Sequence, residues 1–274
     1  MDKQWVRQNL AQREVRFRDI FVWSFELLRE RIGQYIFLTI AVFLPSNLLV
    51  SLLLQKLPDA VTLNQYVQVS ALQLLANLFA MIACSVCVIM VDDQLSEEKE
   101  EKPFGLSFYE GIRTWPMFLL TTVMLMAALF GIVLVIMMLS SFLPILMLPA
   151  MIAVVILALL LVVFMYGANV TAARHSIMLR RNLEMVLLSL KDHLGKTVGL
   201  LLLVTLIGLG LSAPLMTLFD MLIGGRLTGI PLLVIETALQ TVLSIVNIYA
   251  DIAVCLRFLN LEQIRTESRS TTIM

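Results

Sequence analysis

Six long apolar segments constrain the fold of this chain more than any other feature of its sequence. They run approximately over residues 34–54, 67–91, 117–139, 145–168, 197–221 and 230–256. Each has the roughly 20 residues that an α-helix needs to cross about 30 Å of hydrocarbon. Lipid cannot satisfy unpaired backbone groups, and the alternating strands of a membrane barrel are absent from the sequence. The segments are therefore expected to be transmembrane helices, in an all-α integral membrane protein.

The composition agrees with this fold class. Of the 274 residues, 59% are hydrophobic and 15% are charged, whereas soluble domains are about 45–50% apolar and about 25% charged. The charged N-terminal segment lacks the short apolar core and cleavage site of a signal peptide. We therefore expect the first apolar segment to act as both the insertion signal and a permanent anchor.

The distribution of lysine and arginine predicts the orientation. Eighteen of the twenty lie in the N-terminal segment, the second and fourth connections and the C-terminal tail; the three other connections hold only Lys56 and Arg226. Under the positive-inside rule, both termini are then cytoplasmic. This gives a cytoplasmic N-terminal segment (1–33), a six-span membrane domain (34–256) and a cytoplasmic tail (257–274).

Amphipathic stretches precede the outward-going spans. In residues 174–194, apolar residues at spacings of three and four lie opposite basic residues, a pattern typical of a helix in the membrane interface. Similar stretches at 17–32 and, shorter, at 106–115 precede the first and third spans. Their recurrence favours three repeats, each an interfacial helix followed by a two-span hairpin. Chance similarity between amphipathic helices is the alternative.

Basic side chains in and beside these stretches are candidates for contact with anionic lipid headgroups, which contributes about 1 kcal/mol per residue near the surface. They are Arg29, Arg31, Arg113, Arg174, Arg180, Arg181, Lys191 and Lys196. Such contacts indicate anchoring rather than specificity. The expected partners are the bilayer and a membrane or transporter protein, with no nucleic acid.

A polar stripe on the sixth apolar segment is the main candidate for a specific site. Its residues recur at steps of three and four and share one helix side: Glu236, Gln240, Ser244, Asn247 and Asp251. An acid near the bilayer centre costs about 2.5–3.5 kcal/mol, so the stripe should face the bundle interior. Asn47 and Asn77 are candidate partners there. The stripe is either a polar pathway or binding cavity, or a set of interhelical hydrogen bonds that fixes packing.

No pattern of residues indicates a catalytic or metal site. Cys84 and Cys87 have C-x-x-C spacing but lie within an apolar segment, without a second pair or a nearby histidine. His175 and His193 would lie about 27 Å apart on one helix, too far to share a metal. We therefore expect a protein that is not an enzyme and has no metal or other cofactor.

Four stretches carry a resemblance to a known family: residues 21–28 (FVWSFELL), 108–116 (FYEGIRTWP), 186–191 (VLLSLK) and 256–261 (LRFLNL). Together with the six spans, they resemble the membrane domain found beside glycerophosphoryl diester phosphodiesterases and the related YciC-like bacterial inner-membrane proteins. The resemblance implies a six-span fold in the bacterial plasma membrane. It transfers no catalytic residue.

Two functions remain open at this point. The first is a non-enzymatic protein of envelope or membrane homeostasis, or an accessory subunit of a transport system. The second is a permease or lipid-handling transporter that uses the polar stripe of the sixth span. An enzymatic function is the weakest alternative, because intramembrane catalysis would need a cluster of histidine or acidic residues at one depth.

Overall fold

The computed structural model is all-helical in the residues that it describes, which are 3–55, 63–95, 102–142, 147–175, 179–224 and 229–272. A π-helical turn at Asp220–Gly224 extends the eighth of the nine α-helices of this part of the chain. The nine are α1 (Lys3–Gln12), α2 (Phe17–Glu30), α3 (Ile32–Gln55), α4 (Leu63–Leu95), α5 (Phe104–Phe142), α6 (Met147–His175), α7 (Leu179–Leu190), α8 (Leu194–Phe219) and α9 (Ile230–Thr272).

Six of these helices, α3, α4, α5, α6, α8 and α9, are long and apolar enough to cross a membrane. Each contains most of one predicted apolar segment, so the prediction of an all-helical chain with six long apolar helices is confirmed. The helices extend beyond the predicted segments: α5 begins thirteen residues before residue 117, and α9 continues sixteen residues beyond residue 256.

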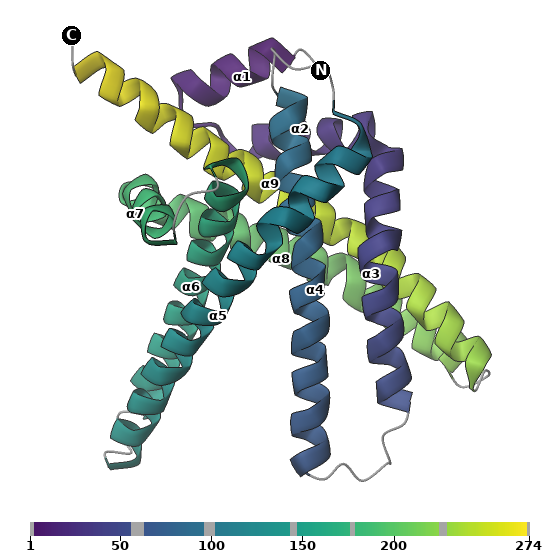
Figure 1. Cartoon of the computed structure of the whole chain (residues 1–274). Helices are drawn as coiled ribbons and strands as arrows, with labels where there is room; N and C mark the ends of the chain where they lie inside the picture. Colours follow the sequence, from purple (N-terminus) through teal and green to yellow (C-terminus); the bar gives the residue numbers. More distant parts are fainter. Residues whose placement is uncertain are drawn as a thin grey trace.

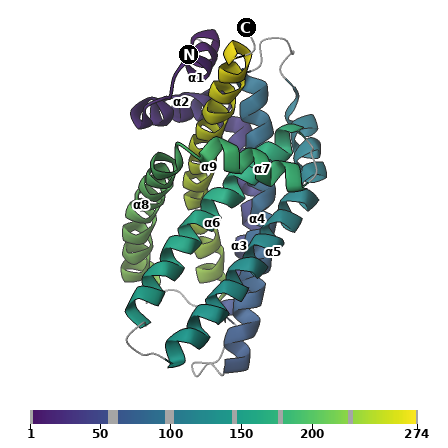
Figure 2. The same cartoon turned by 90° about the vertical axis from the view of Figure 1, so that its left-hand side faces the viewer.

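The long helices form three hairpins, α3–α4, α5–α6 and α8–α9 (Figure 1). The hairpins converge at the end of the molecule that carries α1, α2, α7 and both chain termini, and they spread apart toward the opposite end. Figure 2 shows α9 running between α8 and the α3–α4 hairpin.

The centre of the bundle is the second half of α9. Residues 251–261 are all buried, and α9 contacts α1–α4 and α6–α8. This stretch is mostly apolar, but it also holds Asp251, Arg257 and Asn260. Polar side chains inside a helical membrane protein must find partners on neighbouring helices, and these three do so, as described below.

The chain breaks its helix in two of the three places where an amphipathic stretch meets a span. Arg31 separates α2 from α3 and donates its backbone N–H to the carbonyl of Leu27. A turn at residues 191–193 separates α7 from α8. The third expected helix, 106–115, is not separate, because it forms the first turns of α5.

Packing against α4 accounts for this continuity. Gly111 lies against Val86, where even a Cβ atom on the glycine would come within 3.1 Å of the Val86 backbone. Ser85 Oγ donates to the Gly111 carbonyl at 2.9 Å, and Trp115 Nε1 donates to the Leu78 carbonyl at 3.0 Å. These contacts hold the start of α5 along α4, so the amphipathic stretch continues into the span instead of turning away from it.

Candidate functional site: a cavity beside the polar stripe

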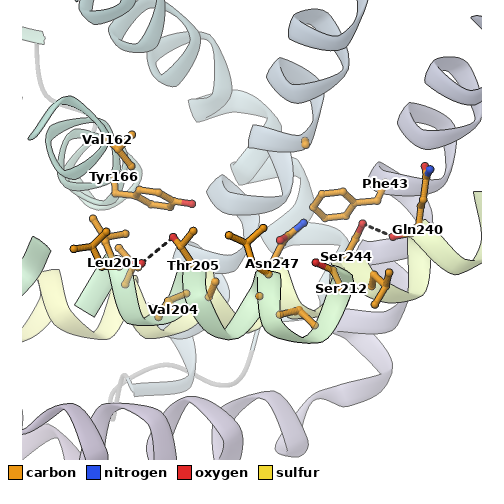
Figure 3. A pocket seen from close by; sticks show the side chains of 18 of the residues that line it. Phe43, Val162, Tyr166, Leu201, Val204, Thr205, Ser212, Gln240, Ser244 and Asn247 are labelled. Atoms are coloured by element: carbon orange, nitrogen blue, oxygen red, sulfur yellow. Dashed lines mark hydrogen bonds between the residues drawn. The ribbon is translucent and has the colours of Figure 1, made fainter. Parts of the chain in front are cut away.

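A cavity of about 840 Å³ lies between α3, α6, α8 and α9, with one residue of α4, Ala80, at its edge. Three residues of the predicted stripe, Gln240, Ser244 and Asn247, line it, and so does Asn47 of α3 (Figure 3). The periodicity predicts that these residues share one side of α9 that faces the interior, and in the structure that side faces the cavity.

Hydrogen bonds order the stripe along α9. Gln240 Nε2 donates to Glu236 Oε1 at 3.1 Å, and Ser244 Oγ donates to the Gln240 carbonyl at 2.9 Å. Across the helix pair, Asn47 Nδ2 donates to Thr241 Oγ1 at 3.3 Å. Asn47 thus joins α3 to α9 through Thr241, which lies beside the stripe, whereas Gln240, Ser244 and Asn247 form part of the cavity wall.

Asn247 is the least constrained polar residue of this wall. Its side chain is exposed, and it has no hydrogen-bond partner among the residues that the structure describes. Figure 3 shows the rings of Tyr166 and Phe43 reaching toward the space above Asn247 from its two sides. The amide is therefore available to a molecule in the cavity.

The walls that α6 and α8 contribute are mostly apolar. Their residues include Leu159, Val162, Val163, Leu201, Val204 and Leu209, with Tyr166, Thr205 and Ser212 as polar exceptions. The Thr205 hydroxyl donates to the Leu201 carbonyl at 2.8 Å, so α8 already satisfies it. The cavity is consequently amphipathic, with amides and hydroxyls along α9 and hydrocarbon along α6 and α8.

The other three predicted residues have different outcomes. Glu236 does not line the cavity and accepts the hydrogen bond from Gln240, which does. Asp251 is buried and does not line the cavity; its carboxyl interacts with the Tyr166 hydroxyl, which does, and with the Cys84 thiol of α4. The side chain of Asn77 lies outside the described residues. Cys84 and Cys87 are free, buried thiols.

A cluster around Glu14 was not found from the sequence. The segment between α1 and α2 places the Glu14 carboxylate 2.7 Å from Arg257 Nη2, 2.6 Å from Lys196 Nζ and 3.2 Å from His193 Nδ1. Partial burial raises the pKa of Glu14, but hydrogen bonds from Lys196 and Arg257 outweigh it and hold the pKa at about 2. Glu14 therefore stays negatively charged and ties the first segment of the chain to α8 and α9.

Asn260 strengthens the same attachment. Its Nδ2 donates to the carbonyls of Leu10 and Arg13 at 2.7 and 2.8 Å, and its Oδ1 accepts from the Val15 N–H at 3.1 Å. The Asn260 side chain thus supplies hydrogen-bond partners to backbone groups at the end of α1 and in the segment between α1 and α2. The sequence does not single out this attachment, because Glu14 is one of five acidic residues among seven basic ones in residues 1–33.

Two arginines, Arg31 and Arg174, form further ion pairs at this end of the bundle. Arg31 Nη2 is 3.2 Å from Asp93 Oδ2, and the two side chains are only 5% and 2% exposed. Arg174 pairs with Asp92 of α4 and Glu262 of α9 at 2.9 and 2.5 Å. Asp92 and Asp93 are the last acidic residues of α4, so they belong to the bundle rather than to the connection that follows.

The candidate headgroup-contacting residues therefore fall into two groups. Arg29, Arg113 and Lys191 are exposed, and Lys196, although paired with Glu14, is 65% exposed. Arg31 differs from the expectation, because burial and its pairing with Asp93 leave its guanidinium without access to a headgroup. Arg174 is likewise directed into the protein by its two carboxylates. The side chains of Arg180 and Arg181 lie outside the described residues.

No known family, curated protein or solved structure matches this chain. Within the described ranges, no group of three or more histidine, cysteine or acidic side chains is placed to hold a metal ion. The chemistry that the cavity offers is binding by amide and hydroxyl groups next to a hydrocarbon wall.

Proposed function

We propose that this protein is a non-enzymatic, multi-pass membrane protein that binds an amphiphilic small molecule in the cavity between α3, α6, α8 and α9. Among the functions left open by the sequence, this favours the permease or lipid-handling transporter. The observation that carries the proposal is the amphipathic lining: Gln240, Ser244 and Asn247 on one wall, aliphatic side chains on the other.

The size of the cavity supports a small-molecule ligand. Binding sites for small molecules and cofactors occupy roughly 300–1,000 Å³, and they combine apolar walls with a few convergent polar groups. A cavity of about 840 Å³ with a free amide at Asn247 has these properties. Stripes of hydrogen bonds that serve only helix packing would leave no such space between the helices.

The attachment of α8 supports passage into and out of this cavity. Helix α8 forms one wall, and its main helix contacts are with α9 and α6, whereas α9 is surrounded by helices. Elements with few buried contacts open at the lowest free-energy cost. The cavity is already partly open, and movement of α8 away from α6 would widen the opening.

The proposal includes a substitution test. Ser212 of α8 lines the cavity, so Ser212→Trp should fill it; the neighbouring Leu211 is 49% exposed, so Leu211→Trp adds the same ring outside. With protein in phosphatidylcholine nanodiscs and a photoreactive monoacylglycerol as the probe, we expect crosslinks on cavity-lining peptides of α8 and α9. Ser212→Trp should abolish them, and Leu211→Trp should leave them unchanged. Crosslinks spread evenly over the outer faces of the helices in the unsubstituted protein would contradict the proposal.

We further propose that the protein lies in a bacterial plasma membrane with both termini in the cytoplasm, and that α2 and α7 lie in the cytoplasmic interface. The distribution of lysine and arginine supports this orientation. So does the position of α1, α2, α7 and both termini at one end of the bundle (Figure 1). The exposed basic residues Arg29, Arg113 and Lys191 would then be free to meet anionic headgroups.

Reporter fusions test the orientation. Fusions after residues 60, 98, 185 and 226 should report the outside, the cytoplasm, the cytoplasm and the outside, in that order. A cytoplasmic signal at 60 or 226 would contradict the six-span arrangement. A fusion after the last residue should also report the cytoplasm.

The threefold repeat and the family resemblance remain part of this proposal. In its favour, α2–α3–α4 and α7–α8–α9 share the order of a short amphipathic helix followed by a hairpin; α5–α6 follows the same order with its first helix merged into the span. The resemblance to the phosphodiesterase-associated membrane domain suggests a role near lipid metabolism. An accessory association with a membrane transport protein is compatible with it.

A further inference from the structure

The charges around the cavity are of one sign. Along the parts of α3, α4, α6, α8 and α9 that lie between their ends, over residues 34–55, 63–91, 147–173, 197–219 and 230–256, the only charged residues are Glu236 and Asp251. No lysine or arginine occurs in any of these stretches. Neither carboxyl group lines the cavity itself, and the nearest basic residue along α9, Arg257, lies one turn beyond the lining residue Val254.

Each carboxyl group is linked to the cavity by a residue of its wall. Gln240 lines the cavity and donates to Glu236 Oε1 at 3.1 Å. Tyr166 also lines the cavity, and its hydroxyl interacts with the carboxyl of Asp251. Both acids thus act on the cavity through a polar side chain that a ligand can touch, although they are about four helical turns apart on α9.

The basic residues nearest in sequence are already occupied. Arg257, six residues beyond Asp251, is fully buried and binds Glu14 and Thr197. Lys196, at the start of α8, also binds Glu14, and Arg174, near the end of α6, binds Asp92 and Glu262. Among the described residues, the side chains that interact with the Asp251 carboxyl are Tyr166 and Cys84, and neither is a cation.

From this arrangement we infer that the ligand of the proposed cavity is a cationic amphiphile, with an organic ammonium group on a hydrocarbon chain. The inference rests on the proposed function and adds the charge of the ligand to it. Inside a membrane protein the effective dielectric constant is low, so an ionised carboxylate attracts a cation and repels an anion more strongly than in water. A cation bound near the buried Asp251 would itself favour the ionised form of that acid. Acidic residues within spans usually mark a pathway for a ligand or an ion.

The aromatic residues of the wall agree with an ammonium ligand. Tyr166 and Phe43 both line the cavity and reach toward the space above Asn247 (Figure 3). Aromatic faces attract ammonium and quaternary ammonium groups through their quadrupole, and the attraction is strongest where water is excluded. An ammonium group between these rings would lie close to Asn247 and to the Tyr166 hydroxyl, while its chain contacts the aliphatic wall of α6 and α8.

Three probes with the same chain and different headgroups test the inference. We would measure the binding of photoreactive dodecyl amphiphiles that carry a trimethylammonium, a glycerol or a carboxylate headgroup, with the protein in nanodiscs of neutral phosphatidylcholine. The ammonium probe should crosslink to cavity peptides with about tenfold higher affinity than the glycerol probe, and the carboxylate probe should bind most weakly.

Variants assign the preference to the two acids. In Glu236→Gln/Asp251→Asn, the affinity for the ammonium probe should fall to that of the glycerol probe, and the glycerol probe itself shows whether the cavity is intact. The single variant Asp251→Glu, in which Glu236 is unchanged and both acidic groups remain, should retain the preference for the ammonium probe. Asp192→Asn, which removes an exposed carboxylate from the turn before α8, is the matched control and should change nothing.

The outcomes separate this inference from the function on which it rests. Equal binding of the ammonium and glycerol probes by the unsubstituted protein would overturn the charge preference and leave the cavity function standing. Retention of the preference in the double variant would overturn its assignment to Glu236 and Asp251. Failure of all three probes to crosslink within the cavity would overturn both proposals.

Discussion

Replacement of Gly111 by alanine is expected to destabilise the protein by about 1–3 kcal/mol, the usual cost of forcing an extra carbon into a packed core. The added Cβ would meet the Val86 side chain and come within 3.1 Å of the Val86 backbone. Backbone atoms cannot turn aside as a flexible side chain can. The helices α4 and α5 must therefore separate, which would also strain the hydrogen bond from Ser85 to the Gly111 carbonyl.

The measurement is the free energy of unfolding in detergent, compared with that of Gly131→Ala. Gly131 lies on the same helix with no atom within 4 Å of an added Cβ. Alanine is a better helix former than glycine by roughly 0.5–1 kcal/mol, so the control should be neutral or slightly stabilising. Equal effects of the two substitutions would show that α4 and α5 do not approach closely at Gly111.

Replacement of Arg31 by methionine is expected to cost about 3–5 kcal/mol, because it leaves a buried carboxylate without its cation. Asp93 is 2% exposed and would keep only the backbone N–H of Lys102, at 3.1 Å from its Oδ2. The pair joins the start of α3 to the end of α4. We therefore expect the loss to appear as destabilisation of the first hairpin, measured as protease resistance of that region and as the unfolding free energy in detergent.

A second substitution and a surface control make this prediction specific. Arg31→Met/Asp93→Leu removes both charges and should recover most of the lost stability, because a buried ion pair can often be replaced by apolar residues without cost. Lys3→Met removes a pair with Glu30 in which the side chains are 30% and 39% exposed, and it should cost less than about 1 kcal/mol. A double variant no more stable than Arg31→Met would mean that Arg31 acts through another contact.

The local sequence pattern was sufficient to predict the long helices and to predict which side of the sixth one faces the interior of the bundle. Apolar length predicts a spanning helix because lipid leaves the backbone no other partner. The four-residue spacing of Gln240 and Ser244 predicts a common side because the helix repeats every 3.6 residues, and both residues do line the cavity. The stripe did not predict that Asp251 would lie behind Tyr166, because that depends on where α6 packs.

The ion pairs could not be predicted in this way. Glu14 and Arg257 are 243 positions apart in the chain, and a count of basic residues treats Arg257 only as a marker of orientation. The same count assigned Arg31 to the membrane surface, although the fold buries it against Asp93. Charge along the sequence reports which side of the membrane a segment occupies, whereas pairing depends on which helices meet there. The missing helix break before the third span has the same origin, since contact with α4 at Gly111 decides it.

The central position of α9 has a consequence for biosynthesis. Helix α9 is the last of the described helices to leave the ribosome, yet α1–α4 and α6–α8 all pack against it. Until it is made, the earlier hairpins lack the surface that unites them, and the groove that receives Arg257 and Asn260 stays open. Domains usually begin to fold from the N-terminal part as it emerges. We expect the bundle to complete its packing only after insertion of the final hairpin. Asn260 of α9 can then donate to the carbonyls of Leu10 and Arg13 and attach the N-terminal segment to α9.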